Sequence, residues 1–127
     1  MHALGRVLVV DDEPQINAML CDMLAGVGYD VKGAIHGAQA LQLMPVFEPN
    51  VVLLDLHMPV MSGMEVLDHL RRDSPALPVI ILSGDADQEV ARRTLRSGAV
   101  NYLMKPFNLE TLRQVVAAAL AHRSRDV

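Results

Sequence analysis

Short apolar runs alternate with longer amphipathic segments along the whole chain. The runs are rich in valine, isoleucine and leucine and are bounded by polar or turn-forming residues, a pattern typical of strands. The intervening segments space their apolar side chains as helices do, for example from Ile16 to Val27. The pattern predicts five βα units, with strands at Arg6–Val10, Asp30–Ala34, Val51–Leu54, Pro78–Leu82 and Val100–Met104.

Several residues mark where the helices begin and end. Pro14 suits the first turn of a helix, and Ser62 followed by Glu65 predicts a capping box at the start of the third helix. Gly98 is suited to a helix C-terminal cap. Pro45 is expected to end the second helix or to kink it, because proline cannot donate the helical hydrogen bond.

The composition of the five runs predicts how the sheet is ordered. Three of them are almost wholly apolar, as strands covered by helices on both faces must be, whereas Asp30–Ala34 and Val100–Met104 are mixed and should lie at the edges. Right-handed crossovers then give an α/β fold, a (βα)5 doubly wound, five-stranded parallel sheet in the order 2-1-3-4-5. Ligands of such sheets bind at the carboxyl ends of the strands.

Composition limits the classes of function. A chain of 127 residues with 51% hydrophobic content is expected to form one domain, here 1–123, with 124–127 as a tail or the start of a linker and the last helix ending near His122. The net charge of -4, with few aromatic residues, argues against direct nucleic acid binding. The apolar runs are too short to cross a membrane. A single cysteine, Cys21, and no apolar leader favour the cytoplasm.

Polar side chains gather where the predicted strands end. Carboxylates at Asp11, Asp12 and Asp55 would repel one another unless a cation lay between them, and their hard oxygens suit Mg²⁺. Asp55 is the best candidate nucleophile, because a carboxylate can attack a phosphoryl donor to form an acyl phosphate. The other groups would face the phosphoryl oxygens: the Lys105 amine, the Ser83 hydroxyl and the Gly84 backbone N–H.

Four motifs, VLVVDDE, VVLLDLHMPVMSG, VIILSG and NYLMKPF, stand in this order along the chain. Together they resemble the receiver domains of bacterial two-component response regulators, which have a flavodoxin-like fold. The resemblance implies that Asp55 is the phosphoacceptor and that Asp12, Asp55 and the His57 backbone carbonyl bind Mg²⁺, with Mn²⁺ as a substitute. Asp11 would assist through water. A cis peptide bond is implied before Pro106.

The same resemblance implies a switch and its partners. On phosphorylation Ser83 would move toward the phosphoryl group and Tyr102 would turn inward, changing the surface of the fourth helix, fifth strand and fifth helix. A sensor histidine kinase or phosphotransfer protein would supply the phosphoryl group, and an output domain, an effector protein or a homodimer partner would bind the changed surface. His57 and Asp85 match positions that tune the phosphoryl lifetime. Asn101 replaces an acid that is usual in the DNA-binding dimers of the family.

Other functions fit parts of the pattern. The chain is expected to be a signalling switch with no enzymatic role beyond its own phosphorylation and dephosphorylation. An aspartyl phosphatase would also use Asp55 and Mg²⁺, but it typically has a second aspartate where His57 stands. A cofactor-binding module of the same shape would need a glycine-rich loop where this chain has acids. A receiver-like interaction module that is never phosphorylated stays open. Asp11 or Asp12 could also simply cap the first helix, and Tyr102 could be an ordinary edge-strand aromatic.

Overall fold

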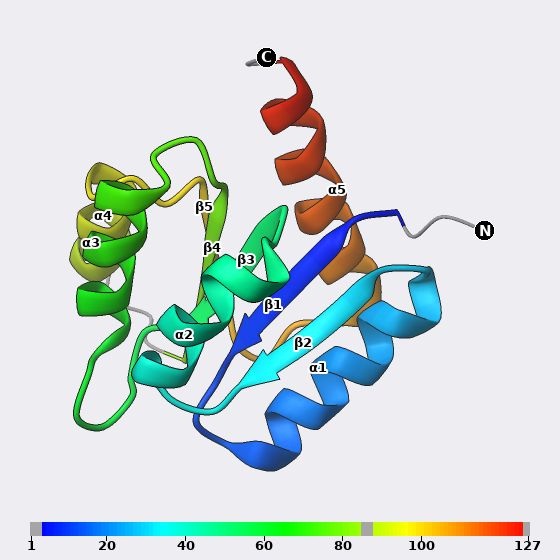
Figure 1. The fold of residues 1–127 in the computed structure, drawn as a ribbon, viewed down its shortest axis with the longest axis horizontal. Coiled ribbons are helices and arrows are strands. Elements are labelled where there is room, and N and C mark those ends of the chain that lie inside the picture. The colour runs from blue at the N-terminus through cyan, green and yellow to red at the C-terminus, as the bar shows by residue number, and fades with distance from the viewer. Residues whose placement is uncertain (1–3, 85–87, 126–127) are drawn as a thin grey trace.

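A computed structural model describes residues 4–84 and 88–125, with 122–125 as helix backbone alone. A single parallel sheet in the order β2-β1-β3-β4-β5 forms its centre, which confirms the predicted order and both predicted edge strands (Figure 1). The strands are β1 (Arg6–Val10), β2 (Asp30–Ala34), β3 (Val51–Asp55), β4 (Val79–Ser83) and β5 (Asn101–Met104). The helices are α1 (Pro14–Val27), α2 (Gly37–Phe47), α3 (Gly63–Asp73), α4 (Gln88–Arg96) and α5 (Leu109–Arg125).

Alternate residues of the strands feed two apolar cores. On one face of the sheet, Val7 and Val9 pack with α1 and α5; on the other, Leu8 and Val10 pack with α2 and α3 (Figure 1). The residues of β3 and β4 are buried throughout. Burial of the central strands on both faces explains why their sequences read as continuous apolar runs. None of the helices within the described ranges has the length and apolar character that a membrane crossing requires.

The predicted caps are present, but some boundaries differ from the prediction. Ser62 and Glu65 form the capping box of α3, and Gly98 has a φ of 106° just after α4. Strand β4 begins after Pro78, which has no N–H to donate, although its carbonyl accepts from Val52. Strand β3 extends to Asp55, β5 begins at Asn101, and α5 continues to Arg125 rather than to His122.

Helix α2 is not ended by its internal proline. It continues through Pro45 to Phe47, and the next residue, Glu48, takes a left-handed conformation with a φ of 52°. The Glu48 N–H donates to the Met44 carbonyl at 3.0 Å. The missing donor of Pro45 leaves the Leu41 carbonyl without its usual helical partner, and the helix ends two residues after the proline.

Backbone hydrogen bonds continue past the strand ends and place the polar residues on one edge of the sheet. The Asp11 N–H donates to the Ala34 carbonyl at 3.0 Å, and the Lys105 N–H donates to the Ser83 carbonyl at 2.7 Å. Helix α3 begins close against β3: a Cβ added to Gly63 would lie 2.4 Å from the carbonyl oxygen of Asp55. Backbone contacts alone thus hold in register the segments that carry Asp11, Asp55, Ser83 and Lys105.

Candidate functional site

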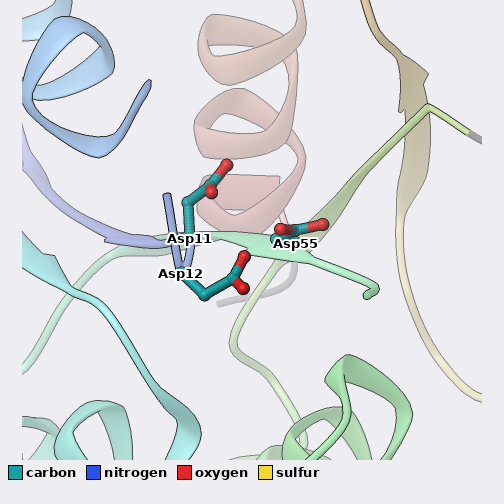
Figure 2. A group of neighbouring side chains, drawn as sticks. All are labelled: Asp11, Asp12 and Asp55. Carbon is teal, nitrogen blue, oxygen red and sulfur yellow. The ribbon is translucent and has the colours of Figure 1, made fainter. Parts of the chain in front are cut away.

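Three aspartates meet at the carboxyl edge of the sheet. Asp11, Asp12 and Asp55 each offer one carboxylate oxygen, and these oxygens all lie within 4.8 Å of one another. Asp11 and Asp12 are consecutive, but both reach the group because the chain leaves the sheet after Val10 (Figure 2). Asp11 is fully buried, Asp55 is 4% exposed, and Asp12 is partly exposed.

Short-range hydrogen bonds orient two of these carboxylates. Asp11 accepts from the Glu13 backbone N–H at 3.0 Å, and Asp55 accepts from the His57 N–H at 3.2 Å. The N-cap position of α1 is Glu13, which makes no side-chain capping bond. Neither Asp11 nor Asp12 occupies that position, so the alternative that they serve as caps of this helix is wrong.

Lys105 lies between two of the acids. Its Nζ is 3.0 Å from Asp11 Oδ2 and 3.9 Å from Asp55 Oδ2. The Lys105–Pro106 peptide bond is cis, as the resemblance implied. Burial lowers the pKa of Lys105, but the hydrogen bond to Asp11 and the negative charges of Asp55 and Asp11 outweigh it, so the pKa is raised overall. The lysine is therefore held in its charged form beside the carboxylates.

The surroundings of Asp55 favour its protonated form and so raise its pKa. Its pKa is raised from 3.8 to about 6: burial is the largest cause, the charge of Asp11 and the hydrogen bond with Asp12 add to it, and Lys105 and the His57 N–H act in the opposite direction. Lys105 is paired with two of the three carboxylates, so the cluster keeps an excess of negative charge. A group of hard oxygen donors with an excess of negative charge is the kind of site that Mg²⁺ or Mn²⁺ occupies, so the donor set fits a divalent cation.

The remaining predicted residues surround this cluster. Ser83 is fully buried at the end of β4, the strand between β3 and β5, and Gly84 follows it on the surface. Tyr102 on β5 is half-buried and packs against the apolar core on the α2 and α3 side. His57 is exposed, as expected for a side chain at the mouth of the site. Asp85 lies outside the described residues.

Asn17 is a buried polar residue that the motifs of the sequence did not point to. Asn17 on α1 is 6% exposed and donates its side-chain amide to the backbone carbonyl of Asp11 at 3.1 Å. The available signal was its position three residues before Leu20, on the apolar side of the helix, where an amide is unusual.

A cleft of about 420 Å³ borders the acidic cluster at Asp12. Its walls come from the segments that follow β2 and β3, and they are mostly apolar. Ile35 and Val60 line it, and Val60 is fully exposed with a φ of 67°. The approach to the acids is therefore partly apolar.

The fold and this arrangement of acids and lysine together define a class of protein. The model of the response regulator receiver domain family matches residues 7–117, and the chain belongs to this family. It is 39% identical over 124 residues to the regulatory protein AtoC of Escherichia coli K12, and the aligned residues make up 98% of this chain and 27% of AtoC. It is 41% identical over 121 residues to the DNA-binding response regulator MtrA of Mycolicibacterium smegmatis, covering 95% of this chain and 52% of MtrA. The chain therefore spans from about a quarter to about half of the length of these relatives.

Solved structures show the same fold. A CheY-like receiver domain protein of Methanospirillum hungatei matches with a TM-score of 0.92 and 29% identity, over 98% of this chain and all of that one. NtrX of Brucella abortus, solved in complex with ADP, matches with a TM-score of 0.93 and 30% identity, over 98% of this chain and 29% of NtrX. The predicted receiver fold is confirmed.

Proposed function

We propose that this receiver domain accepts a phosphoryl group on Asp55, in a reaction that requires Mg²⁺. The observation that carries the proposal is the meeting of three carboxylates within 4.8 Å with one lysine paired to two of them. The donor would be the phosphohistidine of a sensor histidine kinase or of a phosphotransfer protein. The apolar cleft beside Asp12 supports docking of a protein donor, because its walls offer surface that a partner can bury.

Asp12, Asp55 and the His57 backbone carbonyl would hold the cation, with Asp11 acting through water. Mn²⁺, a hard cation that also prefers oxygen ligands, would substitute for it. A divalent cation at this site would offset the negative charge of the transferred oxygens. The pKa of Asp55 is raised chiefly by burial and also by the charge of Asp11, and the charge of the cation would oppose both effects, keeping this carboxylate ionised and nucleophilic.

Phosphoryl transfer needs a nucleophile and donors placed around the phosphorus. An oxygen of Asp55 attacks the phosphorus, the bond to the imidazole nitrogen of the donor breaks, and that nitrogen keeps the electron pair. Lys105, now 3.0 Å from Asp11, would turn its Nζ to a phosphoryl oxygen. The Ser83 hydroxyl and the Gly84 N–H would donate to the remaining oxygens. The product is an acyl phosphate on Asp55.

The phosphoryl group would then change the output surface. Ser83 is buried on β4, and Tyr102 is half-buried on the neighbouring β5. In this proposal Ser83 moves toward the phosphoryl group, and Tyr102 turns into the space that it leaves. The surface formed by α4, β5 and α5 would bind an output domain, an effector or a second copy of the domain. In this proposal the domain comprises 1–123, works in the cytoplasm, and has no catalytic role beyond its own phosphorylation and dephosphorylation.

A small phosphodonor and intact-mass spectrometry test the proposal. The parent chain with Mg²⁺ should gain the mass of one phosphoryl group, and a chelator should prevent the gain. Asp55→Asn should not be labelled, whereas the matched control Asp68→Asn, which changes an exposed acid on α3, should be labelled like the parent. A parent chain that stays unlabelled under these conditions and with a phosphorylated partner would instead indicate an interaction module that works without phosphorylation.

A further inference from the structure

Helix α1 places one amide on its buried face. The buried residues of this helix are Asn17, Leu20 and Leu24, which share one side at helical spacing. Asn17 is 6% exposed, nearly as buried as the two leucines. An apolar residue would satisfy the packing alone, and a buried amide is unfavourable unless its hydrogen-bonding groups are paired.

The Asn17 amide joins two strand ends and the turn between β1 and α1. Its Nδ2 donates to the backbone carbonyls of Ala34 at 2.8 Å, of Asp11 at 3.1 Å and of Val9 at 3.4 Å. Its Oδ1 accepts from the Cys21 thiol at 3.4 Å. Both ends of the amide are therefore bonded, and three carbonyls from separate positions converge on one side chain.

These bonds fix the backbone on both sides of the Asp11 Cα. The N–H of Asp11 and the Nδ2 of Asn17 both donate to the Ala34 carbonyl, while the Asp11 carbonyl accepts from the same Nδ2. The Asp11 carbonyl belongs to the planar peptide that leads into Asp12, so its orientation sets the direction in which the Asp12 side chain leaves the chain. The bonds of Asn17 thus constrain the backbone that carries the two consecutive carboxylates.

The neighbouring strand leaves room for this amide. A Cβ added to Gly33 on β2 would lie 2.2 Å from Asn17 Oδ1 and 3.2 Å from Cys21 Sγ. Real Cβ atoms do not approach other atoms as closely as the first of these distances, so any larger residue at position 33 would displace the amide. The glycine and the asparagine form a matched pair from two separate elements.

We propose that Asn17 is a positioning residue that sets the affinity of the acidic cluster for its divalent cation. This inference rests on the proposed function and adds a residue that does not touch the cation itself. Asn17→Ala should weaken Mg²⁺ binding about tenfold, the lower end of the losses seen when groups bonded to metal ligands are removed. Because the amide acts through backbone geometry, the substitution should leave the three carboxylates in place but badly aligned.

Isothermal titration of the full chain with Mg²⁺ tests this inference. Asn50→Ala is the matched control: the Asn50 side chain is also bonded to the backbone, where its Oδ1 accepts from the Arg6 N–H at 2.7 Å, but it lies at the amino ends of the strands. Both variants should lose stability, and only Asn17→Ala should lose Mg²⁺ affinity. Hydrogen exchange gives a readout without metal: exchange at the Asp11 N–H, relative to the amides of β1, should be faster in Asn17→Ala than in the parent.

Two further variants keep the test decisive if Asn17→Ala does not fold. Gly33→Ala, which displaces the amide while Asn17 is retained, should also weaken Mg²⁺ binding, and Cys21→Ala, which removes only the partner of Oδ1, should not. Parent-like Mg²⁺ affinity in Asn17→Ala, or in Gly33→Ala where that variant is used, would overturn the inference while leaving the proposed function intact. A parent chain that does not bind Mg²⁺ would overturn the proposed function and, with it, this inference.

Discussion

Replacing Asp55 by asparagine should stabilise the folded protein when no divalent cation is present. The pKa of Asp55 is raised from 3.8 to about 6, chiefly because burial disfavours the charged carboxylate. Folding therefore favours the protonated form of this group. Above about pH 6 the ionised Asp55 carboxylate lowers the free energy of unfolding. This destabilisation disappears as the pH falls toward 3.8, because the carboxylate becomes protonated in the folded state.

The size of this penalty follows from the two pKa values. At about 1.4 kcal/mol for each pH unit, the difference between 3.8 and about 6 amounts to about 3 kcal/mol at pH values above 7. Asparagine has nearly the same shape as aspartate and carries no charge, so Asp55→Asn should gain about this free energy of unfolding. The gain should fall to roughly half at about pH 5, where the parent carboxylate is largely protonated in the folded state.

Urea unfolding monitored by circular dichroism at several pH values measures this gain. Saturating Mg²⁺ should narrow the difference, because a cation that binds only the folded parent stabilises it by mass action. The exposed control Asp68→Asn should change stability by less than about 0.5 kcal/mol. If Asp55→Asn were no more stable than the parent at about pH 8 in a chelator, the electrostatic description of the site would be wrong.

Three other substitutions probe the same site. Lys105→Ala removes the ammonium group 3.0 Å from the buried Asp11 carboxylate and should reduce the free energy of unfolding, measured in urea, by about 3 kcal/mol. The amide NMR signals of this variant over α4 to α5 should not shift on phosphorylation; a parent-like shift would refute the role of Lys105 in connecting the phosphoryl group to that surface. Ser83→Ala should still be phosphorylated, but the NMR signals of its Tyr102 ring should not change on phosphorylation. A change like that of the parent would argue against the coupling of Ser83 to Tyr102. Gly63→Ala puts a Cβ against backbone at the end of β3 and should lower the free energy of unfolding by about 3 kcal/mol; an unchanged urea midpoint would contradict this.

Much of the fold could be predicted because the apolar pattern of this chain is consistent with its topology. The buried central strands read as unbroken apolar runs, and the mixed runs are the edge strands β2 and β5. Boundaries were harder to predict where a residue serves two purposes. Pro78 lacks a donor and so precedes β4, yet its carbonyl still pairs with β3. Pro45 lies inside α2, which ends only two residues after it.

The site could be predicted only as a set of residues. Parallel strands bring their carboxyl ends together, which is why Asp11, Asp55 and Lys105 could be expected at one edge. Which acid the lysine pairs with depends on side-chain burial and on the backbone path after β1, and the pattern of the chain carries neither. Asn17 was missed for the same reason: its three carbonyl partners converge only in the folded protein.

The position of the phosphoryl group is the most direct test of the central claim. After reaction with a small phosphodonor and Mg²⁺, the acyl phosphate can be trapped by reduction and located by peptide fragmentation. The account predicts a single modified residue, Asp55, and no modification when a chelator replaces Mg²⁺. Modification at another residue, or equal modification without a divalent cation, would contradict it.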